Sequence, residues 1–293
     1  MKTVRELILV TADWLAGKGV ESARLNAERL LGDVLGLSRL ELYLHHDRPV
    51  DSGELDRFRE LVRQRAAGVP LQTLLGETEF YSRSFKVEPG VFIPRPETER
   101  LVERCVDLLT EGSSRLIAPI AVEVGCGTGV VAVSLLAELP TLRAWATDVN
   151  PAAVRLTEHN ARRLGVAPRL TALAGHLCEP LPAHLAGQVD LLVSNPPYVR
   201  RGDIDGLPPE VSRHDPREAL DGGPDGLGYY RALASLAPRW LQPGGWLAVE
   251  IGADQAEAVA DIFGRGGHLE IAVTRDYNDH PRVVTARRPP AEG

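Results

Sequence analysis

From residue 97 onward the chain alternates between short apolar runs and longer amphipathic stretches, and this alternation is the strongest constraint on its fold. The apolar runs include IAVEVGCG, LRAWATD, VDLLVSN and GWLAVEIG, separated by stretches such as VVAVSLLAEL and AAVRLTEHNARRLG. Strands that are apolar throughout are typical of a parallel sheet buried on both faces. Residues 97–293 are therefore predicted to form a doubly wound, Rossmann-like α/β sheet, with ligands at the carboxyl ends of its strands.

The first 75 residues have a different pattern and predict a small helical domain. Apolar residues recur at helical spacing with charged residues between them, as at Leu7, Ile8 and Leu15. Ser22 stands where a second helix would need an N-cap. Residues 1–75 contain no grouping of side chains suited to catalysis, so we expect this domain to recognise a substrate.

A short segment, residues 76–96, connects the two patterns. Its sequence ETEFYSRSFKVEPGVFIP alternates and is rich in aromatic and β-branched residues. This composition is typical of strands, and it predicts a β-hairpin linker with its turn at Pro89-Gly90.

Composition narrows the class of protein. The net charge of −7 argues against a protein that coats nucleic acid, and no stable nucleic-acid partner is expected. Cys105, Cys126 and Cys178 have neither disulfide-framework nor zinc spacing, so reduced thiols and no metal site are expected. Charged residues interrupt the N-terminal apolar stretch, and no run reaches the roughly 20 apolar residues of a membrane span. A cytoplasmic protein is predicted.

A glycine-rich loop, EVGCGTG, follows the first apolar run of the predicted sheet and precedes a helix. Its glycines allow a tight turn and a close approach of the backbone to a ligand. Val130 stands where a dinucleotide-binding fingerprint would need its third glycine, which disfavours a nicotinamide oxidoreductase. Asp148 ends the next strand and is placed to accept hydrogen bonds from ribose hydroxyls. The two features together predict a site for a nucleoside cofactor.

The stretch Asn195-Pro196-Pro197-Tyr198 ends the fourth predicted strand, at the same edge as the glycine loop. The prolines hold Asn195 in an extended conformation and remove two N–H donors. The Asn195 side-chain oxygen and the Pro196 carbonyl would then face outward as acceptors, and Tyr198 could cover a flat group. This arrangement suits a planar NH2 group, which has two hydrogens to donate.

The glycine loop, Asp148 and NPPY together resemble the Class I S-adenosylmethionine-dependent methyltransferases that modify planar NH2 nitrogens. NPPY alone leaves open the amines of nucleic-acid bases and the side-chain amide of glutamine. Three further stretches, FYSRSFKVEPGVFIPRPETERLV, HDPREALDGGPDGL and RDYNDHPRVV, resemble the peptide chain release factor N(5)-glutamine methyltransferases. The sister family that acts on a ribosomal protein shares the layout but differs at IPRPETE.

This resemblance implies methylation of the glutamine in the Gly-Gly-Gln motif of release factors, with S-adenosyl-L-methionine as cofactor. The alternatives are a glutamine methyltransferase acting on a ribosomal protein and an adenine-amino methyltransferase acting on DNA or RNA. The implied cofactor contacts are Glu123, Gly125, Cys126, Gly127, Thr128, Gly129, Asp148, His176, Leu177 and Asn195. The implied catalytic residues are Asn195, Pro196 and Tyr198. The implied substrate contacts are Asn195, Pro196, Pro197, Tyr198, Phe92 and Arg95.

One position departs from the family pattern. Relatives usually carry an Asp after the third strand, to accept from the adenine amino group, and this chain has His176 there. A neutral histidine has one acceptor nitrogen, which protonation removes. We therefore expect the adenine contact, and not the fold, to differ at this position.

Overall fold

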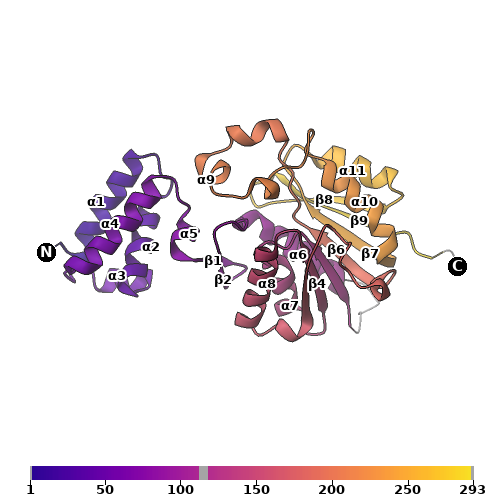
Figure 1. The fold of residues 1–293 in the computed structure, drawn as a ribbon, viewed down its shortest axis with the longest axis horizontal. Coiled ribbons are helices and arrows are strands. Elements are labelled where there is room, and N and C mark those ends of the chain that lie inside the picture. Colours follow the sequence, from indigo (N-terminus) through magenta and orange to yellow (C-terminus); the bar gives the residue numbers. More distant parts are fainter. Residues whose placement is uncertain (1, 112–117, 292–293) are drawn as a thin grey trace. The chain divides into compact units, whose positions relative to one another are not determined.

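The computed structural model describes residues 2–111 and 118–291 (Figure 1). These residues divide into two compact units. The first comprises Met1–Glu77 with Pro208–His214, and the second comprises Thr78–Leu207 with Asp215–Gly293. The predicted limits of 1–75, 76–96 and 97–293 stay predictions, and the return of residues 208–214 to the first unit was not foreseen.

The first unit is built of helices, as predicted. They are α1 (Val4–Gly17), α2 (Ala23–Leu35), α3 (Arg39–Leu44), α4 (Ser52–Ala66), α5 (Leu71–Leu75) and α9 (Pro209–Ser212). The starts of α1, α3 and α4 carry reciprocal capping boxes, which satisfy N–H groups that a helix start leaves unpaired. The pairs are Thr3 with Glu6, Ser38 with Glu41, and Asp51 with Glu54.

Ser22 precedes α2 at the predicted N-cap position, but it does not cap the helix through its side chain. Its backbone is left-handed, with φ of 49°, and its hydroxyl makes no capping hydrogen bond. The Asn26 side chain instead donates to the carbonyls of Glu21 and Ser22, each at 3.1 Å. A side chain of the helix itself, that of Asn26, therefore stabilises the start of α2.

The linker hairpin is present, but its turn was predicted at the wrong place. Strand β1 (Glu77–Phe80) and strand β2 (Arg83–Lys86) are joined by Tyr81 and Ser82. Both residues have positive φ, 50° and 57°, which is what a two-residue turn matching the strand twist requires. Pro89-Gly90 follows the hairpin, and the Gly90 carbonyl accepts from the Asn150 side chain at 2.9 Å.

Seven strands among the described residues form one mixed sheet in the second unit, in the order β5-β4-β3-β6-β7-β9-β8. Five strands are parallel, which confirms the doubly wound prediction, and β9 runs antiparallel to both neighbours. The order reverses between β3 and β6, which is where ligands bind in such sheets. The strands are β3 (Ile120–Val124), β4 (Arg143–Asp148), β5 (Leu170–Ala174), β6 (Val189–Ser194), β7 (Leu241–Glu250), β8 (Leu269–Arg275) and β9 (Pro281–Arg287).

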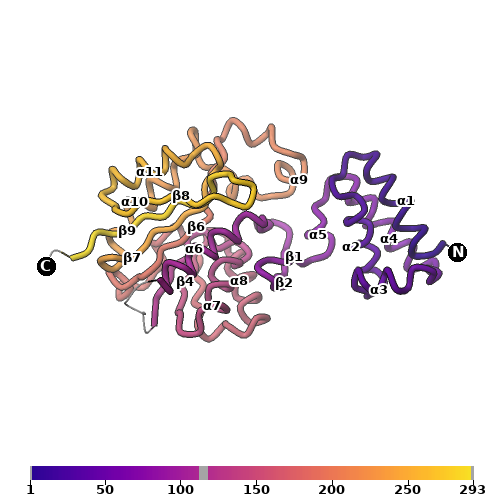
Figure 2. The backbone as a smooth tube through the Cα atoms, turned by 180° about the vertical axis from the view of Figure 1, so that it is seen from behind, coloured from indigo at the N-terminus to yellow at the C-terminus, as the bar shows by residue number. Residues whose placement is uncertain are grey.

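Helices cover both faces of this sheet, and a separate apolar core lies on each face (Figures 1 and 2). Alternate strand residues enter the two cores, so Ala121 packs on one face and Val122 on the other. Helices α6 (Glu99–Thr110), α7 (Val130–Glu138) and α8 (Pro151–Arg163) lie on the first face, and α10 (Gly228–Trp240) and α11 (Ala256–Arg265) on the second. Within residues 2–111 and 118–291, no helix is both long and apolar enough to cross a membrane.

Candidate active site

The glycine loop turns from the end of β3 into the start of α7. Gly125, Gly127 and Gly129 all have positive φ, at 74°, 51° and 81°. A Cβ at Gly125 or Gly127 would meet no atom within 4 Å, whereas one at Gly129 would lie 2.8 Å from Thr157. Gly129 is therefore required for packing, and the first two glycines leave open space along the loop.

Asp148, at the end of β4, is bound to this loop. One carboxylate oxygen accepts from the Gly127 N–H at 2.8 Å, and the other accepts from the Asn150 N–H at 2.8 Å. Burial raises the pKa of Asp148, and these two hydrogen bonds oppose the effect. Each oxygen keeps a further acceptor site. The structure thus brings the two predicted cofactor features into contact, with acceptor capacity left for hydroxyl groups.

Three side chains of the loop region are directed into the protein instead of outward. Glu123 accepts from the Ala132 N–H at 2.9 Å in the first turn of α7, and burial raises its pKa to about 8. Cys126 is buried, and its Sγ accepts from the Thr157 hydroxyl at 3.3 Å. Thr128 is buried as well, and its hydroxyl donates to the Phe92 carbonyl. The roles predicted for these residues could therefore be filled through the backbone only.

The segment after the hairpin lies along the glycine loop. The Thr128 hydroxyl donates to the Phe92 carbonyl at 2.8 Å, and the Asn150 side chain donates to the Gly90 carbonyl at 2.9 Å. Phe92 is thereby fixed beside the cofactor loop, although the two are 36 residues apart in the sequence.

The next part of this segment is held by Asp215, whose side chain is fully buried. Asp215 forms an ion pair with Arg95, and it accepts from the Ile93 N–H at 3.4 Å. The Arg95 guanidinium also lies over the Phe92 ring, 5.2 Å from its centroid. The IPRP and HDPRE stretches, both part of the family resemblance, are therefore structural partners of each other.

Asn195 leaves the sheet directly after β6, next to β3. Its side-chain nitrogen donates to the Thr98 hydroxyl oxygen at 3.2 Å. Pro196 is buried and Tyr198 is half-buried, and burial raises the pKa of the Tyr198 phenol to about 12. The Tyr198 carbonyl accepts from the Gln255 side chain at 3.0 Å. The segment is fixed at both its first and last residue.

The glycine-rich stretch DGGPDGL packs against this segment. Val199 donates to the Leu220 carbonyl at 3.0 Å and accepts from the Gly222 N–H at 2.9 Å. A Cβ at Gly222 would lie 2.9 Å from the Pro197 carbonyl oxygen, so only glycine allows this approach. Sequence reasoning missed the supporting roles of Gly222, Gln255 and Thr98. The paired glycines were the one available signal.

His176 and Leu177 lie in the loop after β5. Gly175 donates to the Asp148 carbonyl at 2.9 Å, which brings this loop to the same sheet edge. His176 is exposed, and within the described part of the chain its ring makes no hydrogen bond. Leu177 has a left-handed backbone, with φ of 48°. Their contact with adenine stays a prediction.

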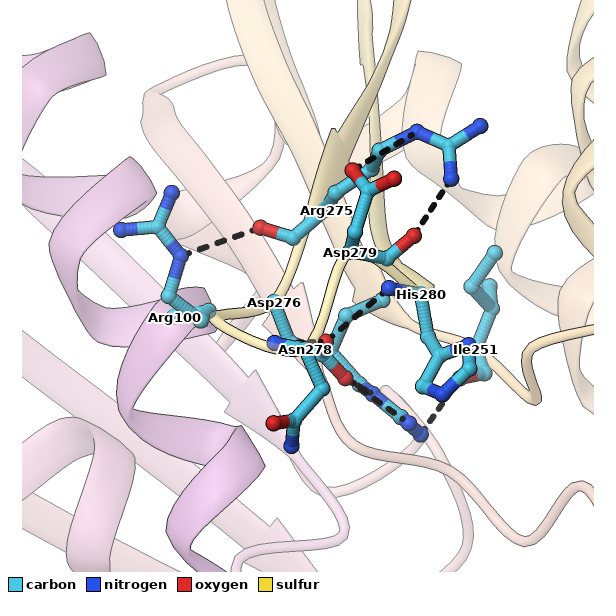
Figure 3. Close-up of polar contacts among 8 residues, drawn as sticks. Arg100, Ile251, Arg275, Asp276, Asn278, Asp279 and His280 are labelled. Carbon is cyan, nitrogen blue, oxygen red and sulfur yellow. Dashed lines mark hydrogen bonds and ion pairs between the residues drawn. The ribbon is translucent and has the colours of Figure 1, made fainter.

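The RDYNDHPRVV stretch contains the end of β8, the loop of residues 276–280 and the start of β9, and Figure 3 shows this region. Asp276 accepts from the Arg282 guanidinium at 3.1 Å, and Arg282 also donates to the Ile251 carbonyl at 3.2 Å. Arg100 in α6 donates to the Arg275 carbonyl at 3.2 Å. The loop thus anchors both the end of β7 and the start of α6, the element that follows Thr98.

The three cysteines are free and buried. Among residues 2–111 and 118–291, no group of three or more His, Cys, Asp or Glu side chains could hold a metal ion.

Two solved structures share this fold. The hMettl16 catalytic domain superposes with a TM-score of 0.56 at 14% identity, over 78% of this chain and 81% of that chain. A methyltransferase from Pyrococcus furiosus gives 0.50 at 14% identity, over 71% and 90%. At such identities the likeness shows the fold alone. Fold, glycine loop and strand-end carboxylate together define the class of S-adenosylmethionine-dependent α/β methyltransferases.

Sequence comparisons narrow this class. The family models described as PrmC N-terminal domain and Methyltransferase small domain match residues 6–76 and 84–206. The release factor glutamine methyltransferase of Geobacter sulfurreducens is 42% identical over 97% of this chain and 96% of its own length. That of Moorella thermoacetica is 42% identical over 98% and 99%. The chain belongs to the release factor glutamine methyltransferase family.

Proposed function

We propose that the protein transfers a methyl group from S-adenosylmethionine to the side-chain amide nitrogen of the glutamine in the Gly-Gly-Gln motif of release factors. The observation that carries this proposal is the placement of Asn195. Glu123 of β3 pairs with Val193 of β6, so the glycine loop and Asn195 leave the sheet at the same level. An amide acceptor therefore lies beside the loop that suits the cofactor.

The residues at this edge fit the cofactor. S-adenosylmethionine supplies a methyl group on a positively charged sulfur, ready for transfer to a nucleophile. The open faces of Gly125 and Gly127 leave room for it along the loop. The remaining acceptor sites of Asp148 suit its ribose hydroxyls. Phe92, a predicted substrate contact, is held beside the same loop because its carbonyl accepts from the Thr128 hydroxyl.

The Asn195 segment would orient the substrate amide. An amide nitrogen is a poor nucleophile because its lone pair is delocalised into the carbonyl. The Asn195 side-chain oxygen and the Pro196 carbonyl can accept from both of its hydrogens, which turns the nitrogen toward the methyl group. Such positioning and electrostatic stabilisation contribute on the order of a hundredfold or more to rates. The nitrogen becomes acidic once methylated, so no strong base is needed.

The helical unit is proposed to recognise the protein substrate. Leu40, Tyr43 and Leu44 on α3 are 68%, 77% and 63% exposed. Residues at this spacing share one face of a helix. Large exposed apolar side chains gathered in this way mark surfaces that bind other proteins. This surface suits a folded substrate that offers more than its glutamine loop.

Serine substitutions test that surface. The triple variant Leu40→Ser, Tyr43→Ser and Leu44→Ser should raise KM for intact release factor while cofactor affinity stays unchanged. Val273→Ser, which removes an exposed apolar side chain of the sheet unit, is the matched control. An unchanged KM in the triple variant would show that α3 does not touch the substrate.

Labelled methyl donor tests the function itself. The protein is incubated in parallel with release factor, release factor whose Gly-Gly-Gln glutamine is changed, ribosomal proteins, and DNA or RNA. We expect label in intact release factor alone. Because release factors act in translation, this result would place the reaction in the cytoplasm. Label in ribosomal protein or nucleic acid, without label in release factor, would replace this proposal by the corresponding alternative.

A further inference from the structure

Glu250 is a buried carboxylate next to Asn195 that the proposed reaction does not yet use. It ends β7 and is 1% exposed. Its neighbour Val249 pairs with Ser194, so Glu250 lies beside the residue that follows β6. Within the described residues its Oε2 atom has no hydrogen-bond partner. Burying a carboxylate with an unpaired oxygen is costly, which calls for an explanation at this position.

Thr98 is the hydrogen-bond partner of Asn195. It is 1% exposed and stands at the N-cap of α6, yet its side chain makes no capping hydrogen bond. Its hydroxyl oxygen accepts from the Asn195 side-chain nitrogen, which leaves its own hydrogen to donate. Burial raises the pKa of Glu250, and hydrogen bonding by the Thr98 and Asn195 side chains opposes this effect. Glu250 and Asn195 directly follow the paired strand residues Val249 and Ser194, so the carboxyl belongs to the strand next to Asn195.

We propose that Glu250 is a positioning residue that, together with Thr98, holds the Asn195 amide with its oxygen toward the substrate. This inference rests on the proposed function. An ionised carboxylate only accepts hydrogen bonds, so it fixes the hydrogen of Thr98 and the NH2 of Asn195 in its own direction. Turning Asn195 by 180° would face NH2 to the substrate NH2, donor against donor, and would place the Asn195 oxygen against an acceptor.

The groups around Glu250 set the pH at which its carboxyl becomes charged. Burial raises its pKa to about 7, and Arg282 opposes this effect while Glu97 adds to it. The Tyr230 hydroxyl donates to the Glu250 carbonyl at 3.0 Å, so it is committed to the backbone and not to the carboxyl. Charged or titratable groups that act here are Glu97 from the turn before α6, Tyr198, Tyr230, and Arg282 with its partner Asp276.

Glu250→Gln tests the proposal because it keeps the shape and introduces a donor. We expect kcat to fall about ten- to hundredfold, with cofactor affinity unchanged within about twofold. Asp190→Asn is the matched control, because Asp190 is also a buried carboxylate beside β7 but lies at the opposite end of β6. The Asp190 carboxylate accepts from the Ile120 N–H at 2.7 Å. The Asp190→Asn variant should leave kcat unchanged. Thr98→Ser should retain more activity than Thr98→Val.

The pH profile separates positioning from a general structural defect. In the wild-type protein, kcat should decline as pH falls through about 7, because protonated Glu250 can donate and no longer fixes Asn195. Glu250→Gln should lack this limb, whereas Asp190→Asn should keep it. A wild-type kcat in Glu250→Gln, or an unchanged limb, would overturn the proposal.

A measurement without release factor distinguishes this proposal from the proposed function. Selective 15N-asparagine labelling gives five side-chain amides, Asn26, Asn150, Asn160, Asn195 and Asn278, and Asn195→Ala assigns the one of interest. Its resonance and hydrogen exchange should change in Glu250→Gln and Thr98→Val but not in Asp190→Asn. A response without methylation of release factor would refute the function alone. Methylation without a response would refute the positioning role.

Discussion

The two halves of the site are supported over very different sequence distances. On the cofactor side, Gly127 and Asp148 bind each other across 21 residues. On the amide side, Asn195 is held by Thr98 across 97 residues, and Tyr198 by Gln255 across 57. The first half is a local strand–loop–helix–strand unit, whereas the second depends on segments that only the complete sheet brings together. A cofactor half can therefore stay intact when the amide half is disturbed.

Asn195→Ala should show this separation most strongly. It removes the acceptor proposed for the substrate amide but no cofactor contact through the glycine loop. Methyl transfer should fall by on the order of a hundredfold or more. Single-turnover rates measure the loss, and calorimetric titration should show that the variant still binds the cofactor. Turnover near the wild-type level would remove Asn195 from its assigned role.

Asp148→Ala should produce the opposite separation. Loss of hydrogen bonds to a charged group should weaken cofactor binding by about 1.5–3 kcal/mol. At saturating cofactor the transfer rate should recover, because the Asn195 segment is unaffected. Unchanged affinity in the titration would mean that Asp148 serves only to hold the loop.

Gln255→Ala tests a support of the amide half that lies outside the Asn195–Tyr198 segment. Gln255 is buried, and its side chain joins the Tyr198 and Gly226 carbonyls. We expect a fall of about tenfold in kcat with little change in cofactor affinity, since one support of the amide half is lost. Kinetics with intact release factor check this. An equal loss of cofactor affinity would show that the two halves are coupled.

The pH dependence of folding tests the buried acid of the cofactor half. Burial raises the pKa of Glu123 to about 8, so between about pH 4.5 and 8 the folded protein binds more protons than the unfolded chain. This group therefore lowers the free energy of unfolding as pH rises through that window, by at most about 1.4 kcal/mol per pH unit. Glu123→Gln should lose this slope in denaturant titrations. Parallel curves for both proteins would contradict it.

His176→Ala should have the smallest effect. The side chain is exposed and makes no hydrogen bond within the described residues. If it accepts from adenine, its loss should weaken cofactor binding about two- to fivefold and leave kcat unchanged. Titration with the cofactor measures this. Identical affinities would leave the adenine contact to the backbone of the loop.

The sequence predicted what local patterns determine. Apolar runs indicated the parallel strands, and spacing alone placed the glycine loop, Asp148 and Asn195 at one sheet edge. Strands β8 and β9 were missed, because β8 is largely exposed and lacks a continuous apolar run. The hairpin turn was assigned to Pro89-Gly90, because nothing in Tyr81 or Ser82 indicates positive φ.

The residues that support the Asn195–Tyr198 segment could not be predicted for another reason. Thr98, Glu250 and Gln255 are ordinary polar residues in their own segments. Their roles arise only when three distant stretches meet at the end of the sheet. A single sequence without aligned relatives carries no signal for such a meeting.

The first unit includes Pro208–His214, a segment that the ribosome synthesises long after the unit's other helices. Arg65 is buried, and it donates to Asn26 at 2.7 Å and pairs with Glu210. Glu210 is synthesised 145 residues after Arg65. At roughly 5–20 residues per second, this takes about 7–29 s. The nascent helices must hold the Arg65 cation without its partner for that time, so they complete their folding only after most of the sheet has been synthesised.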